Sequence, residues 1–403
     1  MKRLYDFVVQ DHLQKYEQMI FLSGPRQVGK TTIARALKEN NKNFYYFNWD
    51  IVSDREKILL GQEEIARIIG INVATAENPI VIFDEIHKYK NWKNYIKGFF
   101  DQHKGNCRII VTGSSRLDAY NRGGDSMMGR YFLYHIFPIT VGELLGRVSY
   151  PRAVVEYPKK LQKEDFNKLI NHGGFPEPLL RNSNIFSSRW KKLRDRQLLK
   201  EDIQSMSNIQ DIDQLEVLVK ILESQVGQII NRSMLSKQIR VSVSTISRWL
   251  DTLKMFYHCF EIRPWARNVK RTLVKEPKVY LYDWSLVKNI GARYENIIAV
   301  HLYKYVMFHN DTGADEYGLF FVRDKDKKEV DFLVVKNDEP WLLVEVKSSS
   351  KVAISKSLYY FAQELNVSNA LQVVFDMEYV DKDCFQFDKP MIVSAQTFLS
   401  QLV

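Results

Sequence analysis

The stretch Gly24-Pro25-Arg26-Gln27-Val28-Gly29-Lys30-Thr31, followed by Thr32, decides the fold of the N-terminal part. Its pattern is GxxxxGK[ST], and it lies between a strand-like run, MIFLS, and a helix-like run, TTIARALKEN. Amides of a glycine-rich loop ahead of a helix can bind phosphates, while Lys30 can reach the β and γ phosphates and the Thr31 hydroxyl can bind magnesium. We therefore predict that residues 24–32 bind ATP and Mg²⁺. The alternative is a glycine turn before an ordinary helix.

Two further apolar runs end in polar residues that suit the same site. The run PIVIF is followed by Asp84 and Glu85, and the run RIIVTG is followed by Ser114. In a parallel sheet these residues come to the carboxyl edge, where ligands bind. We expect Asp84 to hold magnesium through water, Glu85 to orient and deprotonate the attacking water, and Ser114 to act as a sensor between the acids and the γ phosphate. A solvated turn is the alternative for the acid pair.

Composition limits the class of protein and its partners. A chain of 403 residues predicts roughly two to three domains, and an apolar fraction of 45% is enough for a packed core. The net charge of +10 favours a polyanion, nucleic acid or an acidic membrane surface, as partner. No stretch approaches the ~20 apolar residues of a spanning helix, so no membrane partner is expected. Because Cys107, Cys259 and Cys384 are far apart and no export signal is visible, we expect no disulfide framework, no zinc site and a cytoplasmic location.

Hydrophobic periodicity divides the chain into four parts. Residues 1–150 alternate strand-like and helix-like runs, as in a parallel α/β sheet, and residues 151–230 are mainly helical. Residues 231–290 read as helix, short turn, helix and strands. Residues 291–403 read as helix, three strands, helix and strand.

Several short segments together resemble a known family. They are GPRQVGKTT (24–32), FDEIHKYKNW (83–92), VTGSS (111–115), the pair Gly129-Arg130, an FPIT segment ahead of Glu143-Leu144, and GGFPEP (173–178). Together they resemble prokaryotic AAA+ ATPases whose C-terminal part is similar to the restriction-endonuclease superfamily, and the similarity spans nearly the whole chain. The resemblance implies an AAA+ P-loop sheet (1–150) with a helical lid (151–230), a winged-helix module (231–290) and a C-terminal α/β PD-(D/E)xK nuclease-like domain (291–403).

The resemblance also implies an oligomer. In AAA+ proteins the position of Arg130 carries the arginine finger, which neutralises charge on the ATP of a neighbouring subunit. Arg130 is therefore our candidate, and a homo-oligomer, as a ring or another assembly, is expected. Arg116 and Arg122 compete for the role, and a solvent-facing arginine at a helix end is the alternative.

The middle of the chain is basic. Residues 186–290 contain 19 Lys and Arg against 11 Asp and Glu, which gives a net charge of +8. In the second helix of residues 231–290, Ile246 and Leu250 are expected to point inward, as in a DNA recognition helix. The candidate DNA contacts are Ser244, Thr245, Arg248, Lys270 and Arg271. Winged helices also dock proteins, so a protein partner remains the alternative.

The C-terminal part has the D…ExK spacing of restriction-type nucleases. Asp331 begins one apolar strand, and Glu345 and Lys347, two residues apart on another, face the same side. Asp331 and Glu345 could share magnesium, and Lys347 could stabilise an attacking hydroxide. The superfamily resemblance implies Glu295 as one further acid, and Lys356 lies on the following helix. The same acids could instead form a binding surface that cuts nothing.

These observations predict an ATPase that acts on DNA and has a magnesium-dependent nuclease-like domain attached. The alternative is a nucleotide-switched DNA- or protein-binding scaffold whose C-terminal domain is catalytically silent.

Overall fold

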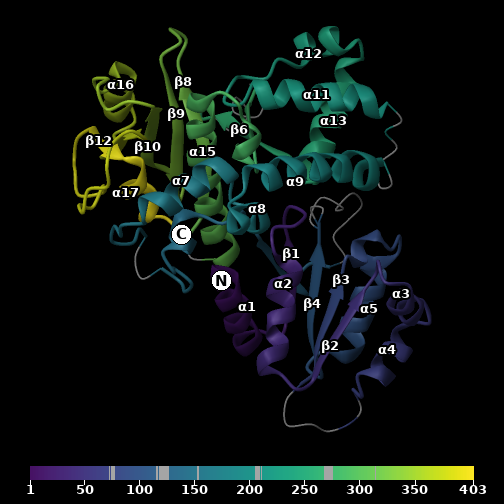
Figure 1. Ribbon diagram of the computed structural model, residues 1–403. Helices are drawn as coiled ribbons and strands as arrows, with labels where there is room; N and C mark the ends of the chain where they lie inside the picture. Colours follow the sequence, from purple (N-terminus) through teal and green to yellow (C-terminus); the bar gives the residue numbers. More distant parts are fainter. Residues whose placement is uncertain are drawn as a thin grey trace. The chain divides into compact units, whose positions relative to one another are not determined.

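The computed structural model describes residues 1–403 except 72, 74–77, 115–116, 118–126, 152–153, 205–208, 210, 267–275 and 314. The described chain forms two compact units (Figure 1). The first comprises Met1–Phe137, Val148–Tyr150 and Met255–Tyr257. The second comprises Pro138–Arg147, Pro151–Lys254 and His258–Val403.

The first unit is built on a five-stranded parallel sheet in the order β2-β3-β4-β1-β5. Its strands are β1 (Met19–Ser23), β2 (Phe44–Asn48), β3 (Ile80–Asp84), β4 (Arg108–Gly113) and β5 (Tyr131–His135). Its helices are α1 (Leu4–Lys15), α2 (Lys30–Ala36), η1 (Leu37–Asn40), α3 (Val52–Leu59), α4 (Gln62–Ile68), η2 (Ile86–Lys88) and α5 (Trp92–His103). The parallel α/β sheet predicted for the N-terminal part is confirmed.

The sheet is buried because its central strands are apolar throughout. Every residue of β1 and of β3 is buried, as expected of parallel strands covered on both faces. On one face, Phe21 and Phe83 pack with Phe99 of α5 in a single core. The register aligns Asp84 of β3 with Thr112 of β4, so the residues that end these strands meet at one edge.

The second unit is built on a mixed seven-stranded sheet in the order β12-β11-β10-β9-β8-β6-β7. Its strands are β6 (Cys259–Pro264), β7 (Lys278–Leu281), β8 (Tyr317–Arg323), β9 (Glu329–Lys336), β10 (Glu339–Lys347), β11 (Asn369–Val374) and β12 (Met391–Ser394). Its helices are α6 (Val141–Leu144), α7 (Lys163–His172), α8 (Pro176–Arg181), α9 (Asn184–Arg196), η3 (Gln197–Ile203), α11 (Ile212–Ser224), α12 (Arg232–Ile239), α13 (Val243–Met255, whose last residue falls in the first unit), η4 (Trp284–Leu286), α15 (Ile290–Thr312), α16 (Lys356–Glu364) and α17 (Ala395–Ser400).

The strand pair that follows α13 is part of this larger sheet. β6 and β7 form an antiparallel pair, and β6 also runs parallel to β8, with Arg263 opposite Phe320. The strands predicted for residues 231–290 therefore share one sheet with those predicted for residues 291–403. This pairing brings β7 into the part of the unit that holds the predicted nuclease residues.

The segment Pro138–Arg147 belongs to the second unit, although its sequence was grouped with residues 1–150. Its Glu143 carboxylate forms an ion pair of 2.8 Å with Lys304 of α15, and both side chains are fully buried. Lys304 also donates to the Thr140 hydroxyl at 2.9 Å. An ion pair and a hydrogen bond therefore join this segment to α15. The four-part division of the chain stays a prediction.

Among the described residues, none of the helices combines the length and the apolar character that crossing a membrane requires. Cys107, Cys259 and Cys384 are buried free thiols.

Candidate functional site

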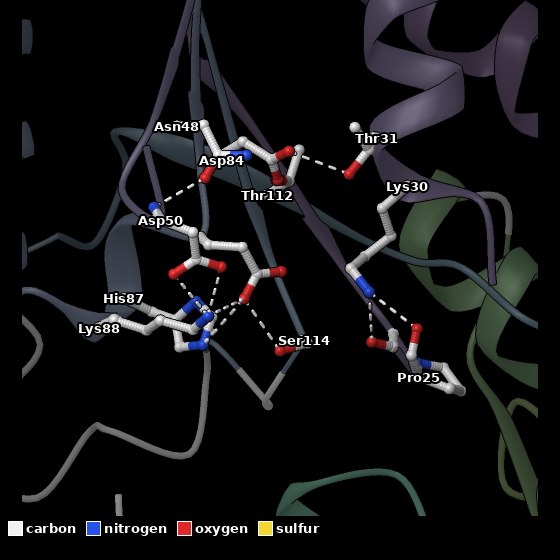
Figure 2. A network of polar contacts seen from close by, with 12 residues as sticks. Pro25, Lys30, Thr31, Asn48, Asp50, Asp84, His87, Lys88, Thr112 and Ser114 are labelled. Atoms are coloured by element: carbon white, nitrogen blue, oxygen red, sulfur yellow. Dashed lines mark hydrogen bonds and ion pairs between the residues drawn. The ribbon is translucent and has the colours of Figure 1, made fainter. Parts of the chain in front are cut away.

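The loop between β1 and α2 needs glycine at two positions. A Cβ atom at Gly24 would clash with the carbonyl oxygen of Ile136, and Gly29 has a φ of +107°, which favours glycine. Lys30 opens α2, and its buried ammonium donates to the carbonyl oxygens of Gly24 and Pro25, each at 2.8 Å (Figure 2). The ammonium thus lies inside the curve of the loop, where phosphate oxygens could replace the two carbonyls as acceptors.

Arg3, ahead of α1, supports this loop and was not predicted. Its Nη1 donates to the carbonyl oxygen of Val28 at 2.9 Å, and its Nη2 donates to that of Phe137 at 2.7 Å. The side chain is buried. No sequence signal marks this arginine, because nothing in the spacing of the motif reaches back to it.

The carboxylate of Asp84, the last residue of β3, accepts hydrogen bonds from hydroxyl groups of three other segments. Figure 2 shows it beside Thr31 and Thr112. Thr31 of α2 donates to its Oδ2 at 2.9 Å. Tyr46 of β2 donates to the same oxygen, and Thr112 of β4 donates to Oδ1. Thr31 and Asp84, both predicted to hold magnesium, are therefore in contact. Tyr46 and Thr112 reach Asp84 because β2 and β4 pair with β3 on either side.

Glu85 lies just beyond β3 in a left-handed backbone conformation, with a φ of 56°. The Ser114 hydroxyl donates to its Oε2 at 3.1 Å, and Lys88 Nζ lies 3.6 Å from the same oxygen. Burial alone would raise the pKa of Glu85, but the His87 imidazole and the ammonium groups of Lys30 and Lys88 hold it below its ordinary value. Burial lowers the pKa of His87 itself to about 4, so at neutral pH the lysines supply the positive charge.

Arg130, the candidate arginine finger, is paired within its own chain. Its Nε and Nη2 contact the two carboxylate oxygens of Asp101 in α5 at 2.7 and 3.0 Å. The side chain of Arg130 keeps 30% of its surface exposed. The competing Arg116 and Arg122 lie outside the described residues.

The predicted recognition helix corresponds to α13. Ile246 and Leu250 are buried, and Ser244 and Arg248 are exposed. Thr245 is half-buried, and its amide donates to the Ser242 hydroxyl at 3.0 Å at the start of the helix. The candidates Lys270 and Arg271 lie outside the part of the chain that the structure describes.

The predicted nuclease residues come together at β9, β10 and α15. Val346 N donates to Asp331 Oδ2 at 2.8 Å, and Lys347 Nζ contacts Glu345 Oε1 at 2.6 Å. Burial, reinforced by the negative charge of Asp331, raises the pKa of Glu295 and that of Glu345 to about 7. The carboxylates therefore lie close enough to repel one another. Lys356 is exposed at the start of α16.

Lys278 and Glu329 also belong to this cluster, a position that the sequence did not predict for them. Lys278 of β7 places its Nζ 2.8 Å from Glu329 Oε1, 3.6 Å from Glu295 Oε1 and 3.7 Å from Asp331 Oδ1. No group of three or more His, Cys, Asp or Glu side chains suited to a metal ion occurs in the described residues. The arrangement at β9 and β10 therefore does not fit the magnesium ion that D…ExK implies, because an ammonium already binds its carboxylates.

Three segments of the chain match known domain families. Residues 16–145 match an AAA domain family. Residues 163–294 and 290–387 match two domains of unknown function, DUF8612 and DUF4143. The first match agrees with the five-stranded sheet and is consistent with binding of ATP and magnesium. None of the three is described as a nuclease.

Two proteins of similar sequence are described as uncharacterized. One from Haemophilus influenzae is 22% identical over 79% of this chain and 80% of its own length. One from Mycobacterium tuberculosis is 20% identical over 90% of this chain and 77% of its own length.

Two solved structures show weak similarity. PCH-2 of C. elegans is 14% identical, with a TM-score of 0.24, over 59% of this chain and 62% of that one. A signal-transduction ATPase with a tetratricopeptide repeat sensor from Pyrococcus horikoshii is 12% identical, with a TM-score of 0.21, over 76% of this chain and 47% of that one. This chain spans less than two thirds of either, and scores this low support no structural argument.

Proposed function

We propose, from the AAA domain of residues 16–145, that this protein binds ATP with magnesium and hydrolyses it to ADP and phosphate. The observation that carries the proposal is the 2.9 Å hydrogen bond from Thr31 to Asp84. It joins the helix that follows the glycine-rich loop to the strand that ends in two acids. The two groups expected to hold the metal thus meet one residue away from Lys30.

Each residue of the site has a distinct part in the proposed reaction. Loop amides and Lys30 bind the phosphates, and Thr31 and Asp84 would hold magnesium, which supplies positive charge to the phosphate oxygens. Because its pKa is lowered, Glu85 is a carboxylate at neutral pH and can orient a water molecule and accept its proton. Ser114, by donating to Glu85, sets the direction of that carboxylate.

The test compares two variants of this site. Lys30→Ala should abolish nucleotide binding, because the ammonium inside the loop is removed. Glu85→Gln should keep binding but lose turnover, because an amide cannot accept the proton. Binding is measured with a fluorescent ATP analogue and turnover by phosphate release, with exposed Lys42→Ala as the control. Normal turnover in both variants would refute the assignment of the site.

We also propose that the protein works as a homo-oligomer in which Arg130 exchanges Asp101 for the ATP of a neighbouring subunit. The ion pair is partly exposed, so this exchange requires no unfolding. Arg130→Ala and Lys30→Ala should each be inactive alone. Mixed together, they should regain part of the activity, because a Lys30→Ala subunit supplies Arg130 to the intact ATP site of its neighbour. A mixture without activity would contradict an arginine finger acting between subunits.

DNA is the partner that we propose for the second unit. The exposed Ser244 and Arg248 of α13, together with the net charge of +8 over residues 186–290, support it. Two candidate functions use this surface: a DNA-directed ATPase with a magnesium-dependent nuclease-like domain, and a nucleotide-switched DNA- or protein-binding scaffold with a silent C-terminal domain. They differ in whether the C-terminal carboxylates bind a metal.

A further inference from the structure

The C-terminal carboxylate cluster is defined here as Glu295, Glu329, Asp331 and Glu345, and it surrounds an amino group of the same chain. Lys278 Nζ lies within 3.7 Å of oxygens of Glu295, Glu329 and Asp331. The lysine is only 3% exposed, and its ammonium lies 5.3 Å from the ring centroid of the buried Phe321. A cation is therefore already present where the carboxylates converge.

The sheet and the surrounding charges hold this cation in place. Lys278 is the first residue of β7, pairs with Ile262 of β6 and forms a bridge with Ile229, which fixes the start of its side chain. Burial and the ion pairs with Glu295, Glu329 and Asp331 hold the rest of the side chain. The ammonium is thus part of the buried cluster and is not a surface lysine.

The remaining donors of the cluster are engaged as well. Tyr280 donates to Glu295 at 2.7 Å, Val346 N donates to Asp331 at 2.8 Å, and Arg323 contacts Glu329 at 3.1 Å. Lys347 contacts Glu345 Oε1, whereas the buried Glu345 Oε2 has no hydrogen-bond partner among the described atoms. Each of the four carboxylates therefore already has a hydrogen-bond or ion-pair partner within the chain.

We infer that the Lys278 ammonium takes the place of a divalent metal in the C-terminal carboxylate cluster, so that the cluster binds no Mg²⁺ or Mn²⁺ while β7 is in place. The charges support this inference. When all four carboxylates are ionised, they face three cations, Lys278, Lys347 and Arg323, which leaves one net negative charge. Without Lys278 two negative charges remain, and a divalent ion would neutralise them.

The consequence is a latent metal site. With Lys278 present, residues 291–403 cut no nucleic acid by a metal-dependent route, and the cluster acts as a structural contact between β7, β9, β10 and α15. Displacement of β7, or loss of the lysine charge, would free Glu295, Asp331 and Glu345 for a metal. This inference does not depend on ATP hydrolysis, because no residue of the first unit enters it.

The experiment is a Mn²⁺ titration of the full chain without nucleotide, in which free Mn²⁺ is measured by electron paramagnetic resonance. Wild type and Asp331→Asn should bind the same number of ions. Lys278→Met, which keeps the length of the side chain beside Phe321, should bind one more Mn²⁺ per chain. The double variant Lys278→Met/Asp331→Asn should lose that ion, and added Mn²⁺ should raise the melting temperature of Lys278→Met more than that of the other proteins.

Two results would overturn the inference. One is a wild type that binds one more ion than Asp331→Asn, because the cluster would then hold metal beside Lys278. The other is a folded Lys278→Met that gains no ion. If Lys278→Met does not fold, the comparison of wild type with Asp331→Asn still decides whether the resting cluster is metal-free. Any Mn²⁺ bound at Asp84 is the same in all variants and drops out of the differences in ion number. A failed test of the carboxylate cluster is therefore distinct from a failed test of the ATP site.

Discussion

The Ser114 hydroxyl donates to Oε2 of Glu85 at 3.1 Å, although the two residues follow different strands. Glu85 leaves β3 in a left-handed conformation, and Ser114 follows the neighbouring β4, so the direction of the carboxylate is set from the adjacent strand. A base positioned in this way depends on its neighbour for orientation rather than for its charge.

Removing that hydroxyl should slow turnover without weakening ATP binding. We expect Ser114→Ala to lower kcat roughly tenfold with little change in KM, because one hydrogen bond to a charged group is removed. Steady-state phosphate release checks this expectation, and ATP binding by the variant serves as the control. A kcat equal to that of the wild type would show that Ser114 does not position Glu85.

The pKa of Glu85 predicts the acidic side of the pH profile. Since it lies below the ordinary value of 4.5, the acidic limb of kcat/KM due to this carboxylate should have its midpoint below pH 4.5. The lowered pKa also means that Glu85 stabilises the fold above its ordinary pKa, and that this contribution disappears as pH falls through the folded-state pKa. Rates are measured only where circular dichroism shows folded protein. A midpoint near pH ~6 assigned to Glu85 would contradict the charge environment described above.

Arg3 should matter for ATP although it lies outside the motif. In Arg3→Met the carbonyls of Val28 and Phe137 lose their donor, so the loop is less well ordered for phosphate. We expect the dissociation constant for ATP to rise roughly tenfold, which corresponds to one or two hydrogen bonds. The neighbouring Lys2 is exposed, and Lys2→Met is the matched control. Equal affinities in the two variants would exclude this role for Arg3.

The buried ion pair between Glu143 and Lys304 should dominate the stability of its part of the second unit. Lys304→Met leaves a buried carboxylate without its cation and should cost about 3–5 kcal/mol. Replacing both partners, as in Lys304→Met/Glu143→Leu, should recover most of that stability. Chemical denaturation followed by circular dichroism measures all three proteins. If the double variant were no more stable than Lys304→Met, the pair would stabilise the fold by more than cancelling the two buried charges.

DNA binding should depend on salt and on the basic residues of the middle segment. Reversing Arg248, Lys270 and Arg271 to Glu should weaken binding and reduce the slope of log affinity against log salt by about 0.9 for each DNA phosphate that the variant no longer neutralises. Fluorescence anisotropy at several salt concentrations measures both effects. Lys42→Glu, a reversal at an exposed site in the first unit, is the control. Binding that ignores salt would argue for a protein partner instead.

Local sequence patterns alone predicted the glycine-rich loop and the residues next to it in the chain. The two glycines and Lys30 lie a few residues apart, between a strand and a helix. Alternation along a strand puts Glu345 and Lys347 on one side of β10. Helical periodicity likewise predicted Ile246 and Leu250 as buried residues of α13. In each case the chemistry depends on residues a few positions apart, whose relative directions are set by the geometry of a single helix or strand.

Only the tertiary structure placed Arg3 on the loop, Thr112 and Tyr46 on Asp84, and Lys278 among the C-terminal carboxylates. These neighbours come from different strands and helices, and strand order and register decide which of them meet. Strand order and register depend on how all strands of a sheet are buried together. The spacing of residues within one segment therefore does not predict strand order or register. The D…ExK pattern predicted a metal because local spacing shows only the carboxylates. The pairing of β6 with β7 and β8 brought the Lys278 ammonium to the same carboxylates.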